Sequence, residues 1–191
     1  MRTLLALLTG IVALALALGI QAVLIKPYRI PSESMVPTLE IGQRVLVNRI
    51  ANNFSDPERG DVVVFKAPLE AQSNTCAEPP PPGLPCVKAS TRKGPETFIK
   101  RVVGLPGDKI RIENGQVTRN GEPEGNEAAQ RCESGDCTFS NEFTVPKGHY
   151  WLMGDNRGAS SDSRVWGPVP REWIIGEAFS TYWPPQRIGL L

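Results

Sequence analysis

The stretch TFIKRVVGLPGDKIRIENGQVTRNG, residues 97–121, decides the fold class of this chain. Its valines and isoleucines recur in short runs that end at glycine, proline or asparagine, a pattern typical of β-strands. Asn114-Gly115 separates two alternating runs, and this dipeptide favours the positive φ angles of a two-residue hairpin turn. The stretch therefore predicts antiparallel strands joined by a tight turn.

The same pattern continues on both sides of this stretch. Four further runs are predicted to be strands: RVLVN (44–48), GDVVVFKAP (60–68), HYWLMGDN (149–156) and EAFSTYW (177–183). After residue 26 no long run has the 3.6-residue apolar period of a helix, apart from a short turn at PREWI, 170–174. We expect one mainly β, antiparallel domain over residues 27–191.

The N-terminal segment has a different composition. Residues 3–25, TLLALLTGIVALALALGIQAVLI, carry no charge, and a helix of this length spans about 34 Å, the thickness of a bilayer core. We expect residues 1–26 to form a single transmembrane anchor. A cleaved secretory signal, with Arg2 as its basic start, is the alternative, but the apolar core of such signals runs only about 7 to 15 residues.

The four cysteines fall into two local pairs. An even number of cysteines in such pairs favours disulfides formed in an oxidising compartment. We favour Cys76 with Cys86 and Cys132 with Cys137. A zinc site made of all four is the alternative, although their spacing lacks the tight C-x2-C pattern.

Two polar segments interrupt the strands. Residues 67–96 are proline-rich, and prolines cannot donate ladder hydrogen bonds. Residues 121–141 are polar and glycine-rich, with CESGDC at their centre. We expect both to be surface excursions, the second a hairpin whose tip is closed by its cysteine pair.

Charge and histidine content exclude several function classes. The net charge is +1, from 21 Lys and Arg against 20 Asp and Glu, so no basic excess exists to make nucleic acid a main partner. His149 is the single histidine. A metal site with two histidines is therefore impossible, and a Ser-His-Asp triad would have to use His149.

Two serines stand in the segment IPSESMVP, residues 30–37. We expect this proline-bounded segment to be extended, which makes Ser32 and Ser34 face the same way. A serine hydroxyl needs an adjacent base to act as a nucleophile, and nothing around His149 marks it as that base. Lys100 lies in an apolar run that would desolvate its ammonium group and lower its pKa. The alternative is that Lys100 belongs to a solvated strand face.

A third segment, MGDNRGASSDSRVWGPVP, spans residues 153–170. It concentrates acids, arginines and serines between glycines: Asp155, Arg157, Asp162, Arg164, Ser160, Ser161 and Ser163. It is either a salt-bridged turn alone or a loop that holds a buried lysine through a serine hydroxyl.

Four motifs in this order, together with the apolar N-terminus, resemble the sequence boxes of the type I (leader) signal peptidases. They are IPSESMVPTLEIG (30–42), RGDVVVFKAP (59–68), FIKRVVGLPGD (98–108) and MGDNRGASSDSRVWGPVP (153–170). The resemblance implies a membrane-bound serine endopeptidase with an antiparallel β catalytic core. It would remove N-terminal signal peptides from exported preproteins by a Ser-Lys dyad, with no metal or organic cofactor.

The resemblance also implies site residues. Ser34 matches the nucleophile and Lys100 the general base, while Ser32 and the backbone N–H of Ser34 match the oxyanion hole. Removing an oxyanion-hole donor typically costs about 10² to 10³ in rate. Residues matched to the support of the base are Ser160, which hydrogen-bonds the lysine, the ion pair Asp162 and Arg164, and the further partners Asp155 and Arg101.

Apolar residues near the serines resemble the walls of the family's shallow S1 and S3 pockets, which accept small residues such as alanine. They are Tyr28, Ile30, Met35, Leu39, Val45, Val64, Phe98 and Ile99; ordinary core is the alternative reading. Two departures from the family stand out: GAS at 158–160 replaces Asp-Asn-Ser, and the insertion carrying Cys76 and Cys86 is longer than expected.

The resemblance places the chain in the bacterial cytoplasmic (inner) membrane as a single-pass, N-in, C-out protein with its catalytic domain on the extracytoplasmic or periplasmic side. Its expected partners are the lipid bilayer and the signal peptides of exported preproteins near the secretion translocon, and we expect a monomer. Alternatives are a relative dedicated to a special substrate such as a conjugative pilin, a cytosolic Ser-Lys self-cleaving repressor, and an inactive membrane-tethered binding module.

Overall fold

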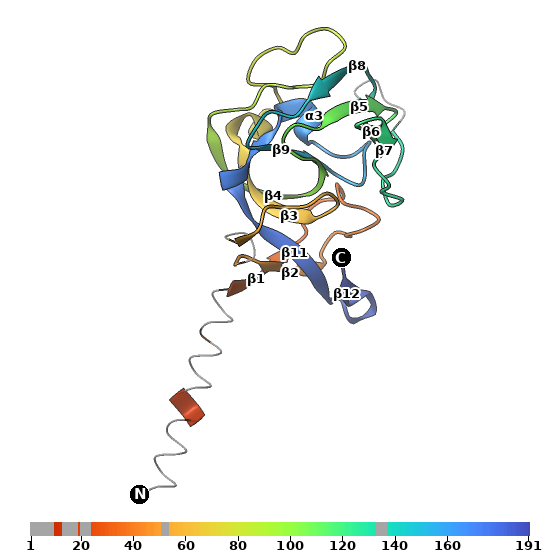
Figure 1. Cartoon of the computed structure of the whole chain (residues 1–191). Helices are drawn as coiled ribbons and strands as arrows, with labels where there is room; N and C mark the ends of the chain where they lie inside the picture. The colour runs from red at the N-terminus through yellow and green to blue at the C-terminus, as the bar shows by residue number, and fades with distance from the viewer. Residues whose placement is uncertain (1–9, 13–18, 20–23, 51–53, 133–136) are drawn as a thin grey trace, which may run out of the picture.

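The computed structural model describes residues 10–12, 19, 24–50, 54–132 and 137–191 (Figure 1). Most of the expected anchor, residues 1–26, lies outside these residues. Within the part of the chain that is described, no helix has both the length and the apolar composition needed to cross a bilayer.

The described strands form two antiparallel sheets. The larger, eight-stranded sheet runs in the order β1 (Ile25–Arg29), β2 (Arg44–Asn48), β11 (Ile174–Trp183), β3 (Val62–Pro68), β4 (Lys93–Gly104), β9 (His149–Met153) and β10 (Val169–Pro170), with β12 (Gly189–Leu190) paired to β11. The four-stranded sheet runs in the order β7 (Glu122–Pro123), β6 (Gln116–Arg119), β5 (Lys109–Glu113) and β8 (Phe139–Thr144). The prediction of a mainly β, antiparallel fold is confirmed.

Helical structure after β1 is short in the described chain. The helical elements whose bounds are described are α3 (Ser163–Trp166) and the 3-10 turns η1 (Leu69–Gln72), η3 (Arg171–Trp173) and η4 (Pro185–Arg187). The predicted turn at residues 170–174 corresponds to η3, whereas α3 was not predicted.

The predicted hairpin joins β5 and β6. Glu113 pairs with Gln116 across the turn, and Asn114 and Gly115 have φ angles of 50° and 75°. A Cβ on Gly115 would lie 2.8 Å from the Cβ of Arg157. The glycine therefore serves both the turn and the close approach of the loop that carries Arg157.

Three apolar clusters hold the sheets together. One lies around Phe65 and Trp166, and another, around Phe143 and Trp151, packs against the smaller sheet. The third lies directly beneath the serine segment and contains Ile30, Met35, Leu39, Val45, Val47, Val62, Val64, Ile99 and Ala178. Met35 and Leu39 thus fasten the segment after Ser34 to the core.

Residues 67–96 are not simply a surface excursion. Their ends belong to β3 and β4, and the disulfide Cys76–Cys86 that we favoured is present. The N–H of Cys86 donates to the carbonyl of Arg164 at 3.0 Å. Glu70 is buried, where it accepts hydrogen bonds from Arg92 and Ser90. Composition missed this packing because a polar side chain can be buried when hydrogen bonds satisfy it, and composition does not show which partners it will find.

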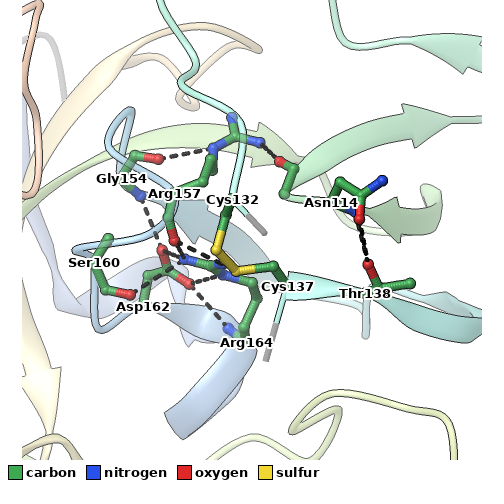
Figure 2. The surroundings of a disulfide bond; sticks show 10 residues. Asn114, Cys132, Cys137, Thr138, Gly154, Arg157, Ser160, Asp162 and Arg164 are labelled. Atoms are coloured by element: carbon green, nitrogen blue, oxygen red, sulfur yellow. Dashed lines mark hydrogen bonds and ion pairs between the residues drawn. A yellow bond between two sulfur atoms is a disulfide. The ribbon is translucent and has the colours of Figure 1, made fainter. Parts of the chain in front are cut away.

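Residues 121–141 also depart from the expectation of an exposed hairpin closed at its tip. The disulfide Cys132–Cys137 is present, but its cysteines are only 4% and 2% exposed. It lies against the loop that carries Arg157 and Arg164 (Figure 2). A disulfide is an apolar group, and here its contact with the neighbouring loop buries it.

Candidate active site

The two serines lie in a turn, which corrects the expectation of an extended segment. The N–H of Val36 donates to the carbonyl of Glu33 at 3.0 Å, and that of Leu39 to the carbonyl of Met35 at 2.8 Å. Burial of the apolar side chains that follow Ser34 folds the segment back on itself. Even so, Ser32 Oγ and Ser34 Oγ are only 3.4 Å apart.

Lys100 reaches the second serine from β4. This strand is paired along both edges, with β3 on one side and β9 on the other, and the Lys100 side chain is 4% exposed. Its Nζ donates to Ser34 Oγ at 2.6 Å. Burial lowers the pKa of Lys100 to about 8, an effect that Asp162 and Asp155 oppose and Arg164 strengthens. A neutral amine at this position can accept the proton of a serine hydroxyl.

A buried ion pair beside the lysine joins Asp162, at the end of the loop after β9, to Arg164 in α3. Arg164 Nε and Nη2 donate to the two carboxylate oxygens of Asp162 at 2.8 and 2.9 Å. Asp162 also accepts hydrogen bonds from the N–H groups of Gly154 and Arg164. Burial acts to raise the pKa of Asp162, but Arg164 and these hydrogen bonds outweigh it, so the net pKa is lowered. Asp162 is therefore a fixed negative charge near the base.

Asp155 forms a second buried ion pair. Arg101 donates to its carboxylate through Nε at 2.8 Å and Nη2 at 2.6 Å. Thr38 and Asn126 donate to the same carboxylate at 2.5 and 2.8 Å. Burial acts to raise the pKa of Asp155, and these donors bring it below its ordinary value. The pair links the turn after Ser34 to β4.

Ser160 is close to the site, but its predicted hydrogen bond to Lys100 is absent from the structure. Among the described residues its buried Oγ has no hydrogen-bond partner, and it lies next to Asp162 and Arg164 (Figure 2). A Cβ on Gly154 would come within 2.3 Å of both Ser160 Oγ and the carbonyl oxygen of Ser34. Glycine at position 154 thus permits the loop to approach the nucleophile.

Arg157 is a site residue to which the sequence analysis gave no role. Its buried guanidinium donates to the carbonyl of Gly154 at 2.8 Å, to the carbonyl of Gly115, and to Glu124. Arg164 donates to the Arg157 carbonyl at 2.7 Å, and Figure 2 shows how Arg157 joins these elements. The sequence signal for Arg157 was its place in the 153–170 motif, whereas Glu124 and Asn126 lie in a polar segment that gave none.

A cleft of about 400 Å³ opens beside the two serines and the lysine. Of the predicted pocket residues, Tyr28, Ile30, Val64, Phe98 and Ile99 line it. Its described walls also include residues that were not predicted: Arg29, Pro31, Thr97, Ala159 and Ser161.

Three of the predicted pocket residues have to be corrected. Met35, Leu39 and Val45 are absent from the described walls of the cleft and are fully buried in the apolar cluster beneath it. They support the site from below, because their side chains are part of the apolar core.

The described residues contain no group of three or more His, Cys, Asp or Glu side chains arranged to hold a metal ion. The zinc alternative required four free thiolates, but the cysteines are joined in two disulfides.

Comparison with known proteins adds to this geometry. Residues 3–183 match the family described as signal peptidase, peptidase S26. The chain belongs to this family. Signal peptidase I of Leptolyngbya laminosa is 39% identical over 179 residues, covering 94% of this chain and 79% of that protein. "Probable signal peptidase I-2" of Synechocystis sp. is 38% identical over 185 residues, covering 96% and 74%.

Among solved structures, a signal peptidase I from Enterococcus faecalis is similar at 23% identity and a TM-score of 0.41, covering 64% of this chain and 97% of that one. Membership of the signal peptidase family makes this chain a serine protease, a hydrolase of peptide bonds. The matched span contains the serine turn, β4 and the 153–170 loop.

Proposed function

We propose that this signal peptidase family member removes N-terminal signal peptides from exported preproteins with Ser34 as nucleophile and Lys100 as base. One observation carries the proposal: the Nζ of a lysine only 4% exposed lies 2.6 Å from Ser34 Oγ. In addition, the Leptolyngbya laminosa relative of this chain is named signal peptidase I.

In the proposed mechanism, Ser34 Oγ attacks the carbonyl carbon of the scissile bond while neutral Lys100 takes its proton. The resulting ammonium gives that proton to the leaving amine, and the mature protein departs. Lys100 then deprotonates a water molecule that hydrolyses the acyl-enzyme. The N–H of Ser34 and the hydroxyl of Ser32, 3.4 Å from Ser34 Oγ, would stabilise the oxyanion in each step.

The supporting roles are part of the same proposal. Ser160 would orient Lys100 once substrate is bound, because catalytic hydrogen bonds often tighten only in the complex. The ion pairs Asp162–Arg164 and Asp155–Arg101 would hold the loop after β9 in a fixed position relative to β4. The cleft walls Tyr28, Ile30, Val64, Phe98 and Ile99 are apolar and favour small, uncharged residues before the scissile bond.

We also propose that residues 1–26 anchor the chain in the bacterial inner membrane, with the catalytic domain on the extracytoplasmic side. The uncharged run 3–25 ends where β1 begins, at Ile25, and β1 leads within a few residues to Ser32 and Ser34. This connection would keep a monomer's cleft close to the headgroups, where a signal peptide emerging from the translocon presents its cleavage site.

The test uses the full chain in detergent with a panel of preproteins. Wild type should cleave after a small residue, while Ser34→Ala and Lys100→Ala each lower kcat by about 10³-fold or more. Ser140→Ala on β8 and Lys109→Ala on β5 are matched controls that should keep full activity, since both residues lie on the smaller sheet.

An active Lys100→Ala variant would refute the dyad. Cleavage of a single preprotein from the panel would instead indicate a relative dedicated to one substrate. Absence of cleavage by folded wild type would indicate a binding module.

A further inference from the structure

Besides the Cys132–Cys137 disulfide, three residues of the segment 121–141 contact the loop after β9. Asn126 Nδ2 donates to Asp155 Oδ1 at 2.8 Å, the N–H of Gln130 donates to the Asp155 carbonyl at 2.8 Å, and Glu124 forms an ion pair with Arg157. The first of these contacts, from Asn126, is to the Asp155 carboxylate, which also bonds the serine turn and β4.

The buried carboxylate of Asp155 accepts four hydrogen bonds. Oδ1 accepts from Arg101 Nε and Asn126 Nδ2, and Oδ2 accepts from Arg101 Nη2 and Thr38 Oγ1. A buried carboxylate is stable only when its lone pairs are satisfied. Arg101 belongs to β4, which carries Lys100, and Thr38 belongs to the turn that carries Ser34. Asn126 is the donor whose own segment carries neither Ser34 nor Lys100.

Through Asp155, this donor is connected to both members of the dyad. Arg101 adjoins Lys100 on β4, and Thr38 lies in the turn that begins at Ser34. The N–H of Asn156, the next residue after Asp155, donates to the carbonyl of Ser34 at 3.1 Å. A rotation of the Asp155 carboxylate would therefore break its hydrogen bonds to Arg101, which adjoins Lys100, and to Thr38 in the serine turn.

We infer that Asn126 is a positioning residue of this peptidase, which orients Asp155 and thereby aligns Ser34 with Lys100. The inference rests on the proposed function of that dyad. Asn126 touches neither reacting group; it acts through the Asp155 carboxylate.

Two features hold Asn126 in place. Its Oδ1 accepts a hydrogen bond from the N–H of Ala128 at 3.1 Å, which closes a local turn. On one side of Asn126 its segment is held by the Glu124–Arg157 ion pair. On the other side it is held by the Cys132–Cys137 disulfide, which lies against the loop after β9 (Figure 2). The two atoms of the Asn126 amide thus have separate tasks, and substitutions can separate them.

Asn126→Asp keeps an oxygen for the Ala128 turn but replaces the donor to Asp155 with a second acceptor. Asn126→Ala removes both contacts without adding charge. Asn141→Asp makes the same chemical change in the same segment, at an amide that donates to the carbonyl of Pro82 instead. All three variants are made in the full chain. Far-UV circular dichroism and melting temperature check that each variant is folded before its kinetics are compared.

We expect Asn126→Asp to lower kcat for a signal-peptide substrate about tenfold or more, with KM within about twofold, because the apolar cleft is unchanged. Asn126→Ala should lower kcat less, and Asn141→Asp should match wild type. A role in the local turn alone predicts the opposite order, with Asn126→Asp near wild type. Wild-type kcat in folded Asn126→Asp would overturn the inference.

A second readout is independent of signal peptides. Acylation of Ser34 by p-nitrophenyl acetate releases one p-nitrophenol per site, so the burst rate reports the alignment of the dyad. Wild type that acylates but cleaves no preprotein would refute the proposed function alone. An unchanged burst rate in both Asn126 variants would refute the positioning role alone.

Discussion

Burial of Lys100 destabilises its ammonium form and favours the neutral amine that a base requires. Three charges tune this balance: Asp162 and Asp155 favour the ammonium, and Arg164 disfavours it. Desolvation is the largest of these effects, and the pKa of Lys100 falls from 10.5 to about 8. At pH 7 about a tenth of the protein would carry a neutral lysine, and at pH 9 about nine tenths.

This pKa predicts an activity limb. Because only the deprotonated lysine can accept the proton of Ser34, kcat/KM should rise about tenfold per pH unit below 8 and level off above it. The measurement is kcat/KM for a soluble signal-peptide fragment from pH 5.5 to 10. A rise in kcat/KM that continues to pH 10 without levelling off, as the ordinary lysine pKa of 10.5 requires, would show that Lys100 is not desolvated in the active form.

The control for this pH dependence of kcat/KM is a substitution of the single histidine, His149. His149 begins β9, where its Nδ1 lies 2.8 Å from the carbonyl of Lys147. His149→Asn should leave the limb in place. Loss of the limb in this variant would assign the titration to the histidine instead of the lysine.

At the scale of elements, the loop from Met153 to Asp162 depends on close backbone approach at Gly154. A Cβ there would lie 2.3 Å from the Ser34 carbonyl oxygen and 2.6 Å from Ser160 Cβ, so the backbone has to move. We predict that Gly154→Ala lowers kcat by about 10²-fold, the effect expected for a displacement of about 1 Å at reacting groups. Single-turnover cleavage measures it.

Gly158→Ala is the matched control in the same loop. A Cβ at Gly158 would lie 3.7 Å from Cys132 Sγ, an ordinary contact, so activity should be retained. Equal losses in both variants would mean that the loop tolerates no alanine and that the approach at Gly154 is not special.

Elements with a strong local pattern were predictable from sequence. Apolar alternation identified β2, β3, β4 and β5, and Asn114-Gly115 identified the hairpin, because these signals act between neighbouring residues. The serine turn was wrongly expected to be extended, since its shape is set by the burial of Met35 and Leu39 in a core built from distant strands.

In the candidate site too, local sequence patterns did not show which distant residues a polar segment contacts. Ser34, Lys100 and the ion pairs of the 153–170 loop were named correctly as neighbours, because motifs of a known family carry them. Glu124 and Asn126 were missed. Their partners lie 33 and 29 residues away, and no local spacing indicates which surface a polar segment will cover.

At the scale of the molecule, the strand order determines where the cleft lies relative to the N-terminus. β1, β2 and β11 lie together at the end of the larger sheet where the chain enters the domain (Figure 1). Tyr28 and Ile30, which line the cleft, are in or next to β1. An anchor joined to β1 therefore restricts the distance between the cleft and the membrane.

If residues 1–26 form the proposed anchor, this arrangement predicts separate roles for the anchor and the site. Deletion of residues 1–24 should leave kcat/KM for a soluble peptide within about twofold of the full chain, because the described site begins at β1. On preproteins in lipid vesicles the same deletion should lower kcat/KM by about 10²-fold, because tethering both partners to one surface raises their effective concentration. Replacing residues 3–24 with an unrelated apolar segment of equal length should restore the vesicle activity while the soluble activity stays constant. Equal loss on both substrates would mean instead that the N-terminal residues stabilise the catalytic domain itself, which the melting temperature of the truncated chain would reveal.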